Sequence, residues 1–234
     1  MKNIRAISLD LDDTLWEVGP VIRRAEAVLW QWLTENYPRI GERFAAPDVG
    51  VLRNRIVDDY PEKAHDFRFL RKRLLARLAL ACDYPESMAE EAFEVFDVAR
   101  NEVDLFPDVL PALDSLAKRF TIVALTNGNA SLEKIGIHEY FAASISAADT
   151  GAAKPAPKIF HAVGERLSLP LEAVLHVGDH PALDVAGAAR VGMRTAWINR
   201  TGAAWPGAIP PPDATADSLG GLAELIARAV ADTG

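Results

Sequence analysis

Short apolar runs rich in β-branched residues alternate with longer amphipathic stretches along this chain. The short runs, each bounded by turn residues, lie at 4–9, 121–125, 144–147, 173–177 and 194–198, and runs of this length and composition predict buried strands. Between them, apolar residues recur at helical spacing at 109–118, 156–167 and 183–191. Strands that alternate with helices indicate an α/β fold, with a parallel sheet of about five strands that helices cover on both faces.

The interval between the first two predicted strands breaks this alternation. Apolar residues recur there at helical spacing at Ile22, Ala25, Leu29 and Trp32, and again within 67–81 and 88–99. A further helix is predicted around 48–59. A connection this long is unusual inside a compact domain. We therefore expect an all-helical domain of four helices at 16–103, inserted into a core formed by 1–15 and 104–234.

The overall charge excludes some classes of partner. Acidic residues outnumber basic ones, 33 to 25, which gives a formal net charge of -8. A surface of this sign repels nucleic-acid phosphates and anionic membranes. The first residues resemble no signal or transit peptide, and no apolar run approaches the roughly 20 residues that span a bilayer. We expect a cytoplasmic protein, a monomer or a homodimer, whose partner is a small molecule.

Polar residues directly follow the predicted strands. In an open parallel sheet, ligands bind beyond the carboxyl ends of the strands, so these residues are candidates for chemistry. They are Asp10, Asp12, Asp13 and Thr14 after the first strand, Thr126, Asn127 and Gly128 after the second, Lys154 in the loop after the third, and Gly178, Asp179 and Asp184 after the fourth. Of these, Asp13 is the one we interpret as a solvated turn residue. We expect the others to converge on one edge of the sheet.

Carboxylates gathered in one place repel each other unless a cation lies among them. Mg²⁺ suits such a site, because it takes oxygen ligands and shares its coordination with substrate phosphate. Asp10, Asp179 and a backbone carbonyl near Asp12 are the candidate ligands. A metal ion also lets a carboxylate approach an anionic phosphate and attack it as a nucleophile.

The motifs Asp10-x-Asp12-x-Thr14, Thr126, Lys154 and Gly178-Asp179, with Asp184 five residues on, resemble the four motifs of the haloacid dehalogenase superfamily. The resemblance covers essentially the whole chain. It implies a Rossmann-like core with a helical cap of type I. It also implies a phosphatase that uses Mg²⁺ and forms an aspartyl-phosphate on Asp10.

The resemblance also implies a role for each motif residue. Asp10 would attack phosphorus, and Asp12 would protonate the leaving alcohol and then deprotonate the hydrolytic water. Thr126, Asn127 and Gly128 would bind phosphate oxygens, and Lys154 would stabilise the transferred group. The metal would be held by Asp10, Asp12 and Asp179, with Thr14 and Asp184 orienting the site. Apart from the motifs, His65 and Asp66 begin the most basic predicted helix. A charge run of this kind is usually a solvated face; the alternative is that Arg71 or its neighbours contact the distal part of a substrate.

Several alternatives remain open at this point. Asp10, Asp12 and Asp184 are also residue types that cap helices and turns. Within the superfamily, dehalogenases lack the second acid because their leaving group is a halide, so Asp12 favours phosphoryl transfer. A phosphomutase keeps both acids, and an inactive binding module is a third possibility. The stretches 10–16, 20–26, 124–130 and 175–179 look like a bacterial branch of riboflavin metabolism that acts on FMN and on 5-amino-6-(5-phosphoribitylamino)uracil phosphate. Trp16 and His180 are further candidates for substrate contact.

Overall fold

The computed structural model describes residues 3–231, so Met1, Lys2 and 232–234, which the sequence boundaries assign to the core, lie outside the described residues. Contacts divide the chain into two compact units. The core unit comprises the chain up to Glu17, Asp104–Gly128 and the chain from Gly136 onward. The helical unit comprises Val18–Val103 and Asn129–Ile135. Between residues 3 and 231, no helix is both long and apolar enough to span a bilayer.

The core unit is built on one parallel sheet, which confirms the predicted α/β class. Its strands have the order β3-β2-β1-β4-β5-β6. The strands are β1 (Ala6–Leu9), β2 (Thr121–Thr126), β3 (Ala143–Ser146), β4 (Val174–Gly178), β5 (Arg194–Ile198) and β6 (Ala214–Ala216). All four residues of β1 are buried, as are all five of β4, because strands covered on both faces have no solvent-facing side.

The sixth strand was not among those that the sequence predicted. β6 pairs with β5 through Ala196, Trp197 and Ile198. It has only three residues, Ala-Thr-Ala, each of which keeps some exposure. It also follows the proline-rich segment at 202–212. A short edge strand of small residues has no apolar run, so hydrophobic patterning does not reveal it.

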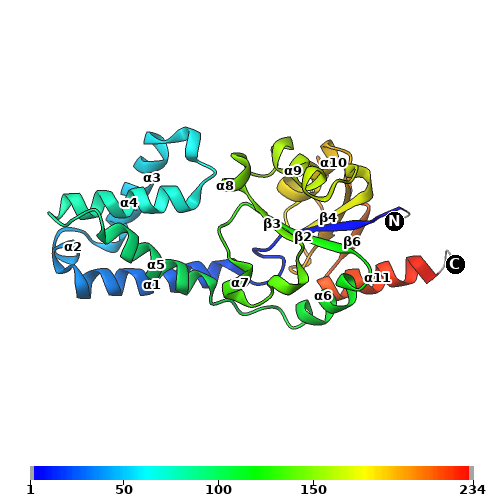
Figure 1. Cartoon of the computed structure of the whole chain (residues 1–234), viewed down its shortest axis with the longest axis horizontal. Helices are drawn as coiled ribbons and strands as arrows, with labels where there is room; N and C mark the ends of the chain where they lie inside the picture. Colours follow the sequence, from blue (N-terminus) through cyan, green and yellow to red (C-terminus); the bar gives the residue numbers. More distant parts are fainter. Residues whose placement is uncertain (1–2, 232–234) are drawn as a thin grey trace. The chain divides into compact units, whose positions relative to one another are not determined.

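Helices cover both faces of this sheet. In Figure 1, α9 (Pro157–Leu167) and α10 (Gly187–Arg190) lie on one side of the strands, and α6 (Val109–Ala117) and α11 (Leu219–Ala231) lie together on the other. Between the sheet and α9, Val123 and Leu125 pack against Ile159, Phe160 and Val163. Short helical segments complete the core unit: η2 (His138–Tyr140), α8 (Ala147–Thr150), η3 (Leu171–Ala173) and η4 (Pro181–Ala186).

The register of the sheet brings the ends of three strands level. Leu9, the last residue of β1, pairs with Ala124 of β2 and with Val177 of β4. The next residue, Asp10, donates its backbone N–H to the Val177 carbonyl at 2.9 Å. Polar residues that follow these strands therefore start from neighbouring points on one edge of the sheet.

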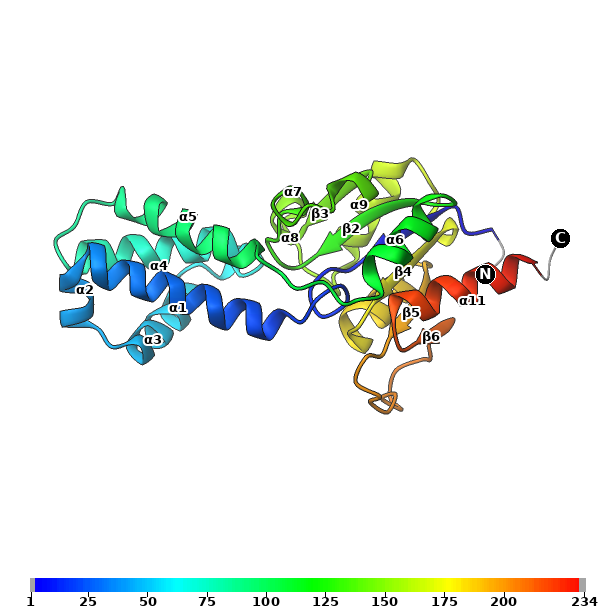
Figure 2. The same cartoon turned by 90° about the horizontal axis from the view of Figure 1, so that it is seen from below.

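The helical unit contains the four long helices that the sequence predicted and shorter ones between them. They are α1 (Val18–Asn36), α2 (Pro38–Arg43), α3 (Ala46–Asp59), η1 (Pro61–Lys63), α4 (Phe67–Ala81), α5 (Met88–Asn101) and α7 (Leu132–Ile135). Helix α1 packs along α5, α5 along α4, and α4 along α3 (Figure 1, Figure 2). Leu29, Leu33, Leu78, Phe93 and Phe96 are among the residues of its buried core.

Two segments lie with a different unit from the one that the sequence boundaries gave them. Trp16 and Glu17, predicted to belong to the helical domain, lie with the core unit. Residues 129–135 follow β2 and were assigned to the core, yet contacts group them with the helical unit. Two interactions with α5 account for this. The Lys134 ammonium lies 2.6 Å from the buried carboxylate of Asp97, and the Ser131 N–H donates to the Asn101 side chain at 2.7 Å.

Four of the five basic residues of α4 are paired with carboxylates of the helical unit, and the fifth, Arg73, lies over the Tyr60 and Phe69 rings. Lys72 bonds Glu90, Arg77 bonds Asp59, and Arg68 lies 3.6 Å from Asp97. Arg71 makes two bonds to Glu26 and stacks 3.4 Å from the Phe96 ring centroid. The helix begins at Asp66, whose side chain accepts the Phe69 N–H. This charged run is therefore an internal ion-pair network of the helical unit.

The Glu26 carboxylate gives a test of that network. Burial opposes its ionisation, but hydrogen bonds and charge from Arg71 and Arg53 bring its pKa below the ordinary value of 4.5. A lowered folded-state pKa adds stability above the unfolded value, and that stability is lost as the pH falls through the folded value. At pH 7 we expect Glu26→Gln to lower the free energy of unfolding by about 1–2 kcal/mol.

The difference from the parent protein should narrow as the pH falls below 4.5, the ordinary pKa of this side chain. Denaturant unfolding followed by circular dichroism at several pH values measures it. Glu224→Gln is the matched control, because the Glu224–Arg228 pair is about 70% exposed on both sides and such pairs contribute about 0.3–0.5 kcal/mol. A Glu26→Gln effect as small as the control's, or one independent of pH, would contradict the prediction.

Candidate active site

A buried ammonium lies at the centre of the polar edge of the sheet. Lys154, which stands before α9, donates to Asp10 Oδ1, and it donates to Asp184 Oδ1 at 2.7 Å. Asp10 follows β1 and Asp184 lies in η4, so one lysine links three segments of the core unit. All three side chains are at least nine-tenths buried, and a charge in such surroundings is stable only when it is paired.

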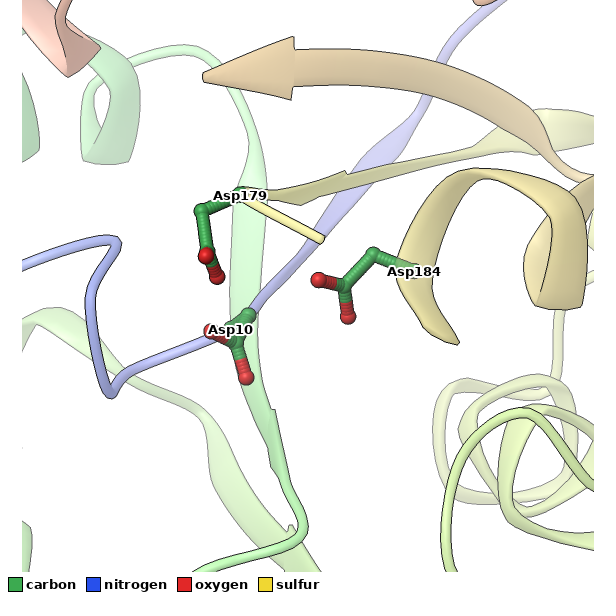
Figure 3. Close-up of side chains that lie close together, drawn as sticks. All are labelled: Asp10, Asp179 and Asp184. Carbon is green, nitrogen blue, oxygen red and sulfur yellow. The ribbon is translucent and has the colours of Figure 1, made fainter. Parts of the chain in front are cut away.

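Asp179 completes a cluster of three carboxylates. Carboxylate oxygens of Asp10, Asp179 and Asp184 all lie within 4.8 Å of one another. Figure 3 shows the three side chains close together, with Asp179 coming from the end of β4. The Thr14 hydroxyl lies between two of them, 3.1 Å from Asp10 Oδ2 and 3.4 Å from Asp179 Oδ1.

The cluster fits a hard divalent cation. Asp184 already accepts bonds from Lys154, from the His176 ring and from the His180 N–H. Asp10 Oδ2 and the Asp179 carboxylate are less committed, because the Thr14 hydroxyl has one proton and donates fully to only one of them. These oxygens are of the kind that Mg²⁺ takes as ligands. Asp10 and Asp179 would hold the ion, with Asp184 supporting the site.

The three carboxyl groups of the cluster differ in pKa. Burial raises the pKa of Asp10 to about 8, although Lys154 acts against the shift. Burial and the nearby Asp184 charge raise the pKa of Asp179 to about 7. Burial opposes ionisation of Asp184 too, but Lys154 and His176 hold its pKa well below the ordinary range. The two groups left with raised pKa values are those that would benefit most from a bound cation.

Asp12 is oriented by a tryptophan four residues on. Its carboxylate accepts the Trp16 Nε1–H at 3.0 Å, and the Trp16 carbonyl accepts the Asp13 N–H at 2.8 Å. Asp13 is exposed, with a φ of 60°. Trp16 is fully buried, so no face of its ring is open for stacking on a ligand. The Trp16 N–H therefore fixes the direction of the Asp12 carboxylate.

The loop after β2 is tied to Lys154. The Asn127 side chain donates to the Lys154 carbonyl at 3.1 Å and accepts the Lys154 N–H at 2.7 Å. The buried Thr126 hydroxyl accepts the Gly128 N–H at 2.9 Å. Because the hydroxyl oxygen accepts this bond, its own proton can still be donated to an oxyanion. The Asn127 side chain therefore positions Lys154, while Thr126 keeps a free donor.

His176 supports Asp184 from within β4. Its Nε2 lies 3.2 Å from Asp184 Oδ1 and its Nδ1 lies 3.0 Å from the Ser8 hydroxyl. An ionised carboxylate only accepts, so Nε2 carries the proton. Burial lowers the pKa of His176 despite the Asp184 charge, which keeps the ring neutral. No local sequence pattern links His176 to Asp184.

Two other candidates have partners of their own. His180 caps η4, where its Nδ1 accepts the N–H groups of Ala182 and Leu183, each at 3.2 Å. In the helical unit, Arg71 is paired with Glu26 and lines a cavity of about 440 Å³ with Phe67, Leu70 and Phe96. Contact of either residue with a substrate stays a prediction.

The core unit thus combines a buried carboxylate beside an ammonium, a second carboxylate on a separate turn, and a free hydroxyl at the end of the next strand. This set can carry out nucleophilic attack by Asp10 with charge stabilisation by Lys154. The fold and this cluster of carboxylates together fit a hydrolase of the α/β class. The chain belongs to the haloacid dehalogenase-like hydrolase family, whose profile matches residues 4–192. The resemblance drawn from the four motifs is thereby confirmed.

Similar proteins carry two kinds of activity in their names. The chain is 34% identical over 203 residues to the 5-amino-6-(5-phospho-D-ribitylamino)uracil phosphatase YigB of Escherichia coli, covering 85% of this chain and 84% of that protein. It is 28% identical to a glyceraldehyde 3-phosphate phosphatase of Methanopyrus kandleri, with 84% of each covered. Among solved structures, a 2-haloacid dehalogenase from Pseudomonas syringae pv. tomato is 40% identical with a TM-score of 0.91, covering 96% of this chain and 99% of that one.

The close approach of Gly178 to Asp184 gives a test of the site. A Cβ added at Gly178 would lie 2.7 Å from the Asp184 Cβ and closer still to its carboxyl group. We expect Gly178→Ala to displace Asp184 and to lower the free energy of unfolding by about 1–3 kcal/mol. Thermal or denaturant unfolding measures the change.

Gly50→Ala is the matched control. Gly50 lies inside α3 with no atom within 4 Å of the added Cβ, so the same substitution there should stabilise the protein by about 0.5–1 kcal/mol. Equal changes in the free energy of unfolding at the two positions would show that Asp184 does not need the space beside Gly178.

Proposed function

We propose that this chain is a Mg²⁺-dependent phosphatase that hydrolyses the phosphate monoester of a small metabolite through an aspartyl-phosphate on Asp10. The observation that carries the proposal is the imbalance of charge at the buried site. Three carboxylates lie within 4.8 Å of one another, and Lys154 is the cation that pairs with two of them. A divalent ion and an anionic substrate together fit such a site better than a neutral substrate alone does.

When bound, Mg²⁺ would offset the charge of Asp10 and Asp179 and of the phosphate oxygens, so that two anions can meet. The chain's own residues do the rest. Asp10 forms the new O–P bond, and the bond from phosphorus to the leaving oxygen breaks. The electron pair of that bond stays on the leaving oxygen, which takes its proton from Asp12 and departs as an alcohol.

The second half of the cycle restores the enzyme. Asp12, now ionised, accepts a proton from water as the water oxygen attacks phosphorus, and Asp10 leaves as a carboxylate. Lys154 stays beside Asp10 throughout and stabilises the oxygens of the transferred group, as does the free proton of Thr126. The Trp16 N–H keeps the Asp12 carboxylate at the turn where both proton transfers take place.

The substrate that we propose is FMN or 5-amino-6-(5-phospho-D-ribitylamino)uracil. The 34% identity with the Escherichia coli phosphatase named for the latter compound supports it, since it extends over 84% of that protein. Both compounds are phosphate monoesters of a ribityl chain that carries a heterocycle.

A second candidate is a 2-haloacid dehalogenase. The 40% identity and the TM-score of 0.91 with the Pseudomonas syringae protein favour it. Such an enzyme also needs a carboxylate nucleophile and a nearby cation, and Asp10 and Lys154 would serve both reactions. It has no use for a general acid, because a halide leaves without a proton. Asp12 and the excess of carboxylates therefore favour the phosphatase.

The first test removes the nucleophile. We expect Asp10→Asn to lower the release of inorganic phosphate at least about 1,000-fold, because a carboxamide does not attack phosphorus. The measurement is a phosphate-release assay over phosphorylated metabolites with Mg²⁺ present. Asp217→Asn, at an exposed position of the core unit, is the matched control and should keep full activity. Release that survives Asp10→Asn would refute the mechanism, and an isomerised sugar phosphate without free phosphate would indicate a phosphomutase.

The second test separates phosphatase from dehalogenase. We expect Asp12→Asn to lower phosphate release about 100-fold or more, since general acid–base catalysis contributes about 10²–10⁴. Removal of Mg²⁺ with a chelator should abolish release, and added Mg²⁺ should restore it. A dehalogenase would instead release halide from 2-haloacids with or without Mg²⁺ and would tolerate Asp12→Asn. Halide release of that kind, with no phosphate release from any metabolite, would overturn the proposed function.

A further inference from the structure

The residues at the end of β5 reach back to both loops of the candidate site, although the four motifs do not include them. Trp197 is the last residue but one of β5 and is 5% exposed. Its Nε1–H donates to the backbone carbonyl of Asp179 at 2.7 Å. Its ring also packs edge-on against Trp205, with centroids 4.9 Å apart. The indole is therefore held from both sides and has little freedom to let the Asp179 carbonyl move.

Arg200, three residues further on, holds the other loop. Its Nε and Nη2 donate to the Thr14 carbonyl at 3.1 and 3.0 Å. The Thr14 hydroxyl in turn lies within bonding distance of Asp10 and Asp179. The guanidinium stacks 3.9 Å from the centroid of the Phe106 ring. A planar fork in this arrangement fixes the carbonyl in both distance and direction.

Asp108 fixes Arg200 from the other side. It accepts two bonds from the guanidinium, at 2.9 and 3.1 Å. The same carboxylate accepts the N–H groups of Leu219 and Gly220 at the start of α11, at 2.8 and 3.2 Å. Arg200 is thus anchored on a helix end of the core unit, and its side chain is only 15% exposed.

We propose that Trp197 and Arg200 are positioning residues of the active site, in which Trp197 holds the Asp179 loop and Arg200 holds the turn that carries Asp10 and Thr14. The inference rests on the proposed function, since it assigns these residues to the same reaction. Its physical basis is that carboxylates brought close together push their loops apart. Anchors on rigid neighbours keep them at the spacing at which they share one ion and one substrate.

The two residues also line a cavity of about 640 Å³ with Asp13, Phe106 and Asp179. Direct contact with the substrate is therefore the alternative that an experiment must separate from positioning. A residue that binds substrate changes KM, whereas a residue that aligns the nucleophile changes kcat. A residue that aligns a metal ligand changes the affinity for the metal.

The experiment compares Trp197→Phe with Arg200→Lys in the full chain. Trp197→Phe keeps an aromatic ring and removes the N–H to Asp179. We expect it to raise the Mg²⁺ concentration needed for half of the Mg²⁺-induced thermal shift by about 10-fold, with kcat at saturating Mg²⁺ within about 3-fold of the parent.

Arg200→Lys keeps the positive charge but loses the paired N–H donors that hold the Thr14 carbonyl. We expect kcat to fall about 10- to 100-fold, with KM and the Mg²⁺ titration each within about 3-fold of the parent. Thr201→Ala is the matched control, because Thr201 lines the same cavity and bonds neither loop. It should leave kcat, KM and the Mg²⁺ titration unchanged.

Three results would overturn the inference. The first is a raised KM with unchanged kcat in Arg200→Lys, which would make Arg200 a substrate-binding residue. The second is an unchanged Mg²⁺ titration in Trp197→Phe, and the third is an equal effect of Thr201→Ala. If Arg200→Lys does not fold, Asp108→Asn replaces it, because it loosens Arg200 without touching Thr14, and an unchanged kcat there would count against the inference.

The inference and the proposed function fail in different ways. A parent protein that releases no phosphate from any substrate sinks the proposed function. The Mg²⁺ thermal titration of Trp197→Phe needs no turnover, so it still decides whether Trp197 holds the Asp179 loop. An active parent protein whose kcat and Mg²⁺ titration are both indifferent to the two substitutions sinks the inference alone.

Discussion

The buried ammonium of Lys154 pairs with carboxylates from two other segments of the core unit, and the site is arranged around that pairing. Taking a lysine out of water costs several kcal/mol unless its charge is compensated, so Asp10 and Asp184 must both lie beside it. Asp184 reaches it only because Gly178 has no side chain to occupy the space between. The Asn127 amide holds the Lys154 backbone from the loop after β2. The four motifs therefore depend on one another for their positions.

The pairing satisfies Lys154 but leaves the carboxylates in excess. Burial raises the pKa of Asp10 to about 8 and that of Asp179 to about 7, so the fold holds two groups that are costly to ionise in the absence of a further cation. Such a site favours the binding of a cation. The anchors on Trp197 and Arg200 act on the loops that carry these two carboxylates. Rigid loops keep the carboxylates from moving apart, which would otherwise relieve the repulsion.

The sequence predicted the strands and the residues that follow them better than it predicted the hydrogen bonds between distant segments. Strands such as β1 and β4 are short and mostly apolar runs, and the acidic residue after each, Asp10 or Asp179, must lie at the edge of the sheet. Local pattern therefore suffices to place these residues. The role of Trp197 depends on an indole that crosses from β5 to a carbonyl 18 residues earlier, and hydrophobic periodicity carries no signal for a bond of that kind. The placement of segment 129–135 was likewise not predictable from local pattern, because it depends on two bonds to α5.

The difference between a phosphatase and a dehalogenase can be traced to few atoms in this arrangement. As the proposed nucleophile, Asp10 beside Lys154 could attack carbon or phosphorus, so the nucleophile does not decide the reaction. The leaving group does, because an alcohol needs a proton and a halide does not. In the proposed mechanism Asp12 supplies that proton. The Trp16 N–H bonds the Asp12 carboxylate, while Lys154 and Thr14 bond Asp10. In the proposed phosphatase the Asp12 carboxylate has a chemical use, because a proton must move to the leaving alcohol.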